Sequence, residues 1–138
     1  MKYTNQLSLL TSFILFGLLL TACGPDTGEA RLYGQWKNKK DHVYIFEEGG
    51  NAMWVYPVGA QTDTFFIKYR LDDVKEPAQL DFYDFDSGPM KGKTMYGIVE
   101  FMEDERGEAI RVNFQVGEDE SVRPEGVGKG GGRLYVRL

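Results

Sequence analysis

The residue with the clearest chemical role in the sequence is Cys23, the only cysteine among the 138 residues. It follows an apolar run from Leu7 to Leu20 that is interrupted only by Ser8, Thr11, Ser12 and Gly17. Two small residues, Thr21 and Ala22, separate this run from Cys23. Because a secreted chain gains nothing from one unpaired thiol, acylation is the use that we expect for Cys23.

The sequence Leu20-Thr21-Ala22-Cys23 resembles the lipobox of bacterial lipoproteins. Residues 1–22 would then be a cleaved signal peptide, whose apolar core is shorter than a membrane span of about 20 residues. An ordinary secretory signal and a retained membrane anchor are the alternatives. The resemblance implies that two or three acyl chains hold the mature chain at the lipid bilayer of the cell envelope. Gly24 stands where an aspartate often marks inner-membrane retention, so we expect the outer membrane in a Gram-negative cell.

Other residues that could do chemistry do not form a catalytic or metal-binding pattern. His42 is the only histidine, which excludes a Ser-His or Cys-His nucleophile pair and a multi-histidine metal site. We interpret it as a strand-edge residue. Asp81, Asp84 and Asp86 loosely resemble a calcium loop, but the third acidic position and the distal glutamate are missing, so we interpret them as a solvated strand end. We therefore predict a protein that is not an enzyme and has no metal or cofactor.

The glycine-rich segment from Gly117 to Gly132 is the remaining candidate for a ligand loop. A phosphate-binding Walker loop needs glycine at position 123 and a Ser or Thr after Lys129, but the chain has Arg123 and Gly130. We interpret the segment as a mobile loop between two strands.

The mature chain is acidic. Removing residues 1–22 takes away one lysine and no acidic residue, which leaves 116 residues with 15 basic and 21 acidic side chains. The sequence contains no basic cluster, and a negative surface repels phosphate backbones, so we expect no nucleic-acid partner. The 17 glycines and 14% aromatic residues of the whole chain favour a β-rich domain with many turns.

Period-two alternation of apolar side chains predicts one domain of eight strands over residues 32–138. Residues 23–31 have no such pattern and are expected to be the lipidated cysteine with a short tether. The expected strands cover residues 32–37, 43–46, 52–58, 62–71, 79–85, 95–101, 110–115 and 134–138. The last strand alternates between two sets of side chains: Leu134, Val136 and Leu138, and Arg133, Tyr135 and Arg137.

Eight sequential strands joined mainly by short turns predict an all-β, up-and-down antiparallel barrel, because closure leaves no unpaired sheet edge. A two-sheet β-sandwich is the alternative. On the first strand, Leu32, Gly34 and Trp36 are expected to share one face.

The motif Gly34-Gln35-Trp36 resembles the Gly-x-Trp motif of lipocalin-like proteins, which lies on the first strand at the closed end of the barrel. In those proteins an arginine near the last strand packs over the tryptophan, and Arg133 and Arg137 could both do so here. The chain is shorter than typical lipocalins and lacks their terminal helix. The remainder is similar to a bacterial family of small lipocalin-like domains of unknown function, through Tyr69-Arg70-Leu71-Asp72, Leu80-Asp81, Gly97-Ile98-Val99, Arg123-Pro124-Glu125-Gly126 and Arg133 to Leu138.

Two hypotheses for the function follow. In the first, the barrel binds a small apolar ligand near the membrane surface, in a cup lined by Trp54, Tyr56, Phe65 and Tyr69. In the second, the barrel is a non-catalytic envelope module that contacts another protein or the cell wall through its outer face and loops. An open apolar cavity would favour the first hypothesis, and a filled interior with an exposed aromatic patch the second.

Overall fold

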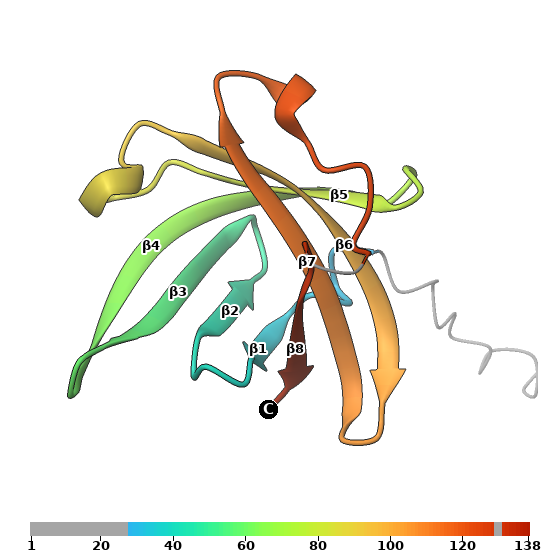
Figure 1. Cartoon of the computed structure of the whole chain (residues 1–138), viewed down its shortest axis with the longest axis horizontal. Coiled ribbons are helices and arrows are strands. Elements are labelled where there is room, and N and C mark those ends of the chain that lie inside the picture. Colours follow the sequence, from blue (N-terminus) through green and yellow to red (C-terminus); the bar gives the residue numbers. More distant parts are fainter. Residues whose placement is uncertain (1–27, 129–130) are drawn as a thin grey trace, which may run out of the picture.

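The computed structural model describes residues 28–128 and 131–138. They form a closed barrel of eight antiparallel strands in sequence order, in which the last strand pairs with the first. This confirms the predicted up-and-down barrel and excludes the two-sheet sandwich (Figure 1). The predicted signal peptide, Cys23 and most of the tether lie outside the described residues. Within the described part of the chain, no helix has the length and apolar character needed to cross a membrane.

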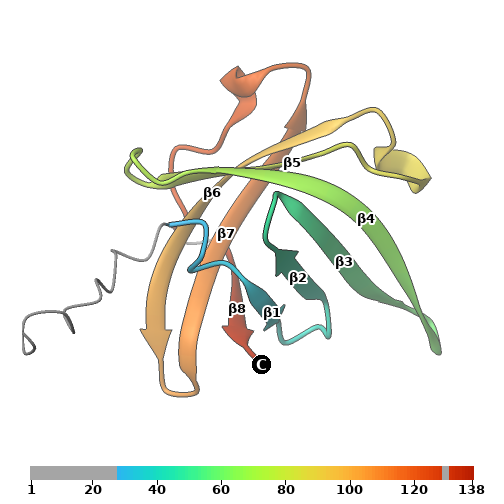
Figure 2. The same cartoon turned by 180° about the vertical axis from the view of Figure 1, so that it is seen from behind.

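The barrel combines long and short strands. In Figures 1 and 2 the short strands β1, β2 and β8 lie between the long hairpins β3–β4 and β6–β7. Two 3-10 helices, η1 (Gly88–Met90) and η2 (Glu120–Val122), follow β5 and β7. The strands are β1 (Gly34–Lys37), β2 (Val43–Glu47), β3 (Asn51–Val58), β4 (Gln61–Asp72), β5 (Ala78–Tyr83), β6 (Thr94–Asp104), β7 (Gly107–Gly117) and β8 (Arg133–Arg137).

The barrel core is mainly aromatic. Tyr44 stacks on Tyr135 with ring centroids 4.6 Å apart, and Phe82 stacks on Phe114 at the same distance. Gly97 makes room for the second stack, because a Cβ at this position would lie 2.2 Å from the Phe114 ring. The buried aromatic residues of the core are Trp36, Tyr44, Phe46, Phe65, Tyr69, Phe82, Phe85 and Tyr135. Inward-facing rings of this size fill the space that a ligand would need.

The side chains of β8 alternate between the two faces of the sheet as predicted. Tyr135 and Arg137 point into the barrel, and the aliphatic residues point outward. Tyr135 is 0% exposed, whereas Leu138 is 70% exposed. The register explains this orientation, because β1 pairs with β8 through Trp36 and Arg137. Residues that face each other on neighbouring strands point to the same side of a sheet. Since Trp36 points inward, Arg137 and Tyr135 must do so too.

The segment after β7 does not form the mobile loop that the sequence predicts. From Gly117 to Gly128 it is held against the outer face of the barrel. Within η2, the Asp119 carboxylate accepts a 2.8 Å hydrogen bond from the Ser121 amide. Arg123 is buried against the sheet, with 10% of its side chain exposed, and Val127 is 6% exposed. The prediction of a mobile loop is therefore wrong for this part of the segment.

Candidate functional site

Trp36 closes one end of the barrel. The residue is 1% exposed, and its Nε1 donates a 2.6 Å hydrogen bond to the Leu32 carbonyl oxygen. The guanidinium carbon of Arg137 lies 4.1 Å from the ring centroid. Of the two arginines that the resemblance proposed for this role, Arg137 occupies the position and Arg133 does not. Gly34 has a φ of 109° beside this pair, a backbone conformation that favours glycine.

Arg137 also connects the beginning of the domain to its last strand. Its guanidinium donates to the carbonyl oxygens of Arg31 and Tyr33, the former at 2.8 Å, and forms an ion pair with Glu108. A polar hollow of about 320 Å³ lies outside Trp36, lined in part by Arg31, Arg137 and Glu108. Trp36 therefore separates the barrel core from an open polar surface.

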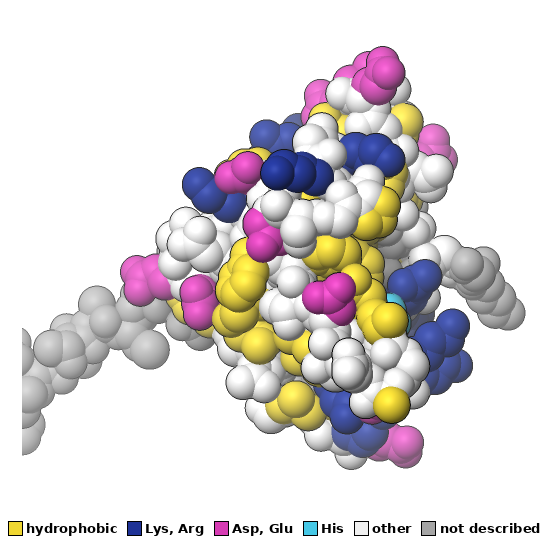
Figure 3. Space-filling model, turned by 90° about the vertical axis from the view of Figure 1, so that its left-hand side faces the viewer, with side chains coloured by type: hydrophobic (Ala, Val, Ile, Leu, Met, Phe, Trp, Pro, Cys, Tyr) yellow, Lys and Arg dark blue, Asp and Glu magenta, His cyan; other side chains and the backbone are white. Residues whose placement is uncertain are grey.

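A second aromatic group, the hairpin patch, consists of His42, Trp54, Tyr56 and Phe65. Tyr56 stacks on Phe65 with ring centroids 5.0 Å apart, and Trp54 lies 5.6 Å from Tyr56 and 5.8 Å from Phe65. The last β2–β3 pair is Val43 with Val55, so the β3–β4 hairpin extends past the end of β2. The patch therefore lies partly at the surface, and Figure 3 shows hydrophobic side chains on this face with the histidine at their edge, next to basic side chains.

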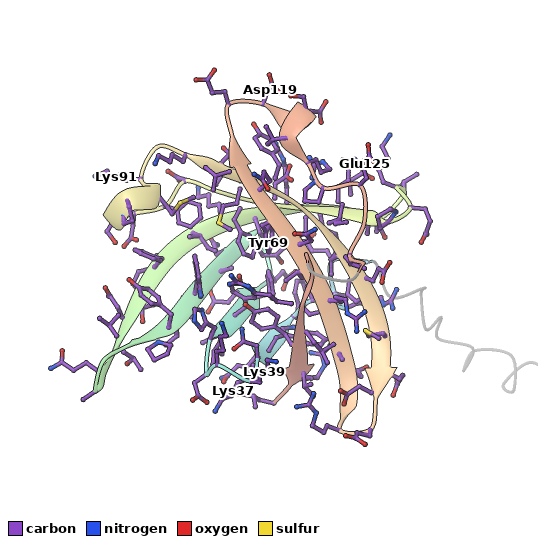
Figure 4. All side chains as sticks on the ribbon, in the orientation of Figure 1. Lys37, Lys39, Tyr69, Lys91, Asp119 and Glu125 are labelled. Atoms are coloured by element: carbon purple, nitrogen blue, oxygen red, sulfur yellow. The ribbon has the colours of Figure 1, made fainter. Side chains whose placement is uncertain are left out.

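Three of the four residues predicted to line a ligand cup thus lie together, and the fourth lies elsewhere. Tyr69 contacts Phe46 with ring centroids 5.0 Å apart and donates a 2.9 Å hydrogen bond to the Glu47 carbonyl oxygen. Its label lies over the middle of the barrel in Figure 4, and the residue is 2% exposed. Tyr69 is thus a core residue that does not line the same space as Trp54 and Tyr56.

The cavity that reaches the barrel interior beside Trp54 is small. Its volume is about 130 Å³, whereas sites for drug-sized ligands have volumes of about 300–1,000 Å³. Burial raises the pKa of Tyr44 and Tyr135, so both phenols are neutral at physiological pH. The cavity is lined by Tyr44, Trp54, Met95, Val112, Asn113, Phe114, Gly131 and Arg133.

His42 stabilises the hairpin patch as a neutral hydrogen-bond acceptor. Its Nδ1 accepts a 3.2 Å hydrogen bond from the Trp54 Nε1. Partial burial lowers the pKa of His42, and the positive charges of Arg133 and Lys40 lower it further. The neutral imidazole that this bond requires is therefore the main form at pH 7.

Asp81 is the centre of a buried ionic network that the sequence analysis missed. The residue is 3% exposed, so it is not the solvated strand end that we predicted. Its carboxylate accepts hydrogen bonds from Nη1 and Nη2 of Arg123, from Arg70 Nε at 2.9 Å and from the Gly97 amide at 3.3 Å. Among the described residues, no three acidic, histidine or cysteine side chains are grouped to hold a metal ion.

A third feature is a basic groove outside the barrel, with a volume of about 610 Å³. No basic cluster is visible in the sequence, because the cations that line this groove come from four separate segments. Their convergence results from the closure of the barrel, which brings the β1–β2 turn next to β8 and β7. The basic residues of the groove are Lys37, Lys39, Lys40, Arg106, Arg111 and Arg133.

Comparison of the chain with protein-family models, with curated protein sequences and with solved structures finds no match. A closed barrel of this kind hosts many unrelated functions. A function for this chain must therefore be inferred from the closed end, the hairpin patch and the basic groove.

Proposed function

We propose that the chain is a lipid-anchored protein of the bacterial cell envelope whose barrel is a non-catalytic interaction module. The filled barrel interior beside a partly exposed aromatic patch is the observation that carries this proposal. A cavity of about 130 Å³ has no room for a lipid, whereas aromatic side chains often supply most of the binding energy at protein interfaces. The partner on this view is another envelope protein or the cell wall.

The proposal also includes a relationship of the barrel to lipocalin-like domains and attachment of the chain to the membrane through Cys23. The position of Arg137 over Trp36 supports this relationship, together with the closed barrel of eight strands. The lipobox sequence supports acylation, and Gly24 after the cysteine favours the outer membrane of a Gram-negative cell. The Gly28 amide donates a 3.0 Å hydrogen bond to the Asp73 carboxylate on the barrel, so with Cys23 acylated the chain from Cys23 to Gly28 reaches at most about 18 Å. The hairpin patch would then meet its partner close to the bilayer surface.

The Cys23→Ala variant is expected to remain an unlipidated precursor, because the thiol is both the acyl acceptor and the group that the signal peptidase requires. Metabolic labelling with a radioactive fatty acid, followed by immunoprecipitation, measures this. The Thr21→Ser variant keeps a small residue before the cysteine and serves as the labelled control. Equal labelling of Cys23→Ala and wild type would contradict the lipoprotein assignment.

Photo-crosslinking tests the role of the hairpin patch. A benzoylphenylalanine at Val58, which is 53% exposed at the hairpin tip, is expected to give a discrete adduct in intact cells. The same residue at Val74, which is 90% exposed in the β4–β5 turn, is the control and should give none. Adding Tyr56→Ala to the Val58 probe should remove the adduct, because Tyr56 contributes exposed area to the patch.

The apolar-ligand hypothesis gives the opposite results. If native mass spectrometry of the protein purified from the envelope finds a stoichiometric apolar molecule, and the Val58 probe forms no adduct, the barrel is a carrier and the interaction module is wrong.

A further inference from the structure

The basic groove lies at the seam where the barrel closes. The strand β8 pairs with β7 from Arg133 to Val136, but it pairs with β1 only at Val136 and Arg137. Among the described strands, the edge of β8 from Arg133 to Tyr135 therefore has no partner on the β1 side. The groove opens along this edge, between the β1–β2 turn and the segment that includes Val127 and Gly128.

The β1–β2 turn presents two lysines from a backbone that is held by hydrogen bonds. Asn38 is 8% exposed, and its Oδ1 accepts hydrogen bonds from the amides of Lys40 at 2.8 Å and His42 at 3.1 Å. The Asn38 amide donates a 3.0 Å hydrogen bond to the His42 carbonyl oxygen. Lys39 and Lys40 are exposed on this turn. Figure 4 labels Lys39 next to Lys37 at the β1–β2 end of the barrel.

The opposite side of the groove depends on close packing around Gly132. A Cβ at this position would lie 2.7 Å from the Val127 carbonyl oxygen and 2.9 Å from the Arg111 side chain. Only glycine therefore allows the Val127 segment to approach β8 and Arg111 as closely as it does. This packing holds the aliphatic part of Arg111 in place beside the groove.

The charges of the groove are largely unneutralised. Lys37 pairs with Asp41 at 2.8 Å and Arg106 with Asp104 at 2.9 Å. Among the described residues, no carboxylate lies within 4.0 Å of Lys39, Lys40, Arg111 or Arg133. Glu100 on β6 is the cross-strand partner of Arg111, but the two side chains do not form an ion pair at this distance. Four described cations with no carboxylate within 4.0 Å are notable on a chain with a net charge of −5, because most of its surface repels anions.

We propose that this groove binds an anionic ligand that carries at least two phosphate groups. The cations lie on both sides of a concave surface, and two of them are arginines, whose planar guanidinium groups match phosphate oxygens in pairs. The volume of about 610 Å³ is within the range of small-ligand sites and exceeds the space that one phosphate needs. A soluble phosphorylated molecule and a lipid headgroup are two sources of this chemistry.

Titration calorimetry with inorganic pyrophosphate tests the proposal, using the full-length chain in an uncharged detergent. We expect saturable binding with a Kd of about 10–100 µM in 50 mM NaCl, weakened several-fold in 300 mM NaCl by screening. The double variant Arg111→Gln and Arg133→Gln should weaken binding about tenfold. Lys39→Gln with Lys40→Gln should weaken it about threefold or more, and these exposed turn residues do not contribute to the core.

The matched control is Lys75→Gln with Lys91→Gln, which changes the net charge equally. Both lysines are exposed in turns away from the groove, so pyrophosphate affinity should change less than about twofold. Circular dichroism checks that each variant keeps the wild-type fold. Absence of saturable binding, or an equal loss of affinity in the control and groove variants, overturns the proposal.

Competition distinguishes the two sources of phosphate. If cardiolipin added to the detergent micelles displaces pyrophosphate, whereas phosphatidylcholine does not, the ligand is a lipid headgroup. If pyrophosphate binds equally with either lipid, the ligand is a soluble phosphorylated molecule. The groove belongs to the folded barrel, so neither result depends on whether Cys23 is lipidated or the hairpin patch has a partner.

Discussion

Replacing Trp36 with alanine is expected to lower the free energy of unfolding by about 3–5 kcal/mol, the range for deleting a buried aromatic side chain. The Trp36 ring is among the largest side chains of the core and is 1% exposed. Its removal would open the core to the polar hollow beneath it, which Trp36 itself lines. Water can enter from that side, so the surrounding side chains lose packing contacts and no closed cavity is left in the core.

Two further contacts are lost in Trp36→Ala. The Leu32 carbonyl oxygen loses its hydrogen bond from Nε1 in a buried position, and an unmade buried hydrogen bond costs about 1–3 kcal/mol. Arg137 loses the ring beneath its guanidinium, a contact that contributes roughly 0.5–1 kcal/mol at an exposed site. These contributions overlap with the loss of packing and are not added to it.

Denaturant unfolding followed by circular dichroism measures the effect, with two variants for comparison. Trp36→Phe keeps an aromatic ring but has no N–H donor, so it should lose about half as much stability as Trp36→Ala. Arg137→Ala should cost less than Trp36→Ala, because Arg137 lies on the outer side of the ring. A loss below about 1 kcal/mol for Trp36→Ala would show that the residue does not close the barrel.

Alternation in the sequence was sufficient to predict the barrel and most of its inward faces. It placed Trp36 on the same face as Leu32, and both residues are buried. The last strand could not be oriented this way, because both of its faces carry large side chains. Aliphatic residues at positions 134 and 136 favour one orientation, whereas the pairing of Trp36 with Arg137 imposes the other. Register is a property of two strands and is not visible in either strand alone.

The basic groove and the Asp81 network were missed for a related reason. Arg123 and Asp81 are 42 residues apart in the sequence, and the cations of the groove come from positions 37 to 133. Each residue looks like an ordinary surface charge in its own segment. The sequence contained one local signal of this contact. Arg123 lies between an acidic and a glycine-rich stretch, and an arginine followed by proline is not typical of a mobile loop.

The Asp81→Ala variant is expected to lose about 3–5 kcal/mol of stability, the range for removing one partner of a buried ion pair. Arg123 is 10% exposed at its side chain and would keep the 2.6 Å hydrogen bond to the Gly97 carbonyl oxygen, a 3.9 Å contact with Glu120 and its position 5.6 Å from the Tyr96 ring. The matched control is Arg70→Ala. Arg70 bonds the same carboxylate but is 62% exposed at its side chain, so its loss should cost less than about 1 kcal/mol.

The same network predicts how stability depends on pH. Burial opposes ionisation of Asp81 and is the largest single influence on its pKa, but hydrogen bonds from Arg123, Arg70 and the Gly97 amide together outweigh it. The pKa of Asp81 is therefore lower in the folded protein than its usual value. The resulting stabilisation is present above the unfolded pKa of about 3.9 and disappears as the pH falls through the lower folded value.

Denaturant unfolding between pH 7 and pH 2 should accordingly give a steeper acid loss of stability in the wild type than in Asp81→Asn, which cannot titrate. Limited proteolysis adds a local measurement, because Arg123 holds the segment after β7 against the barrel. At pH 7 the Arg123→Ala variant should be cleaved between Gly117 and Gly128 faster than the wild type, while Arg70→Ala should resist cleavage. Equal cleavage of wild type and Arg123→Ala would mean that the segment is held without the ion pair, and that the buried charges contribute little to the position of the loop.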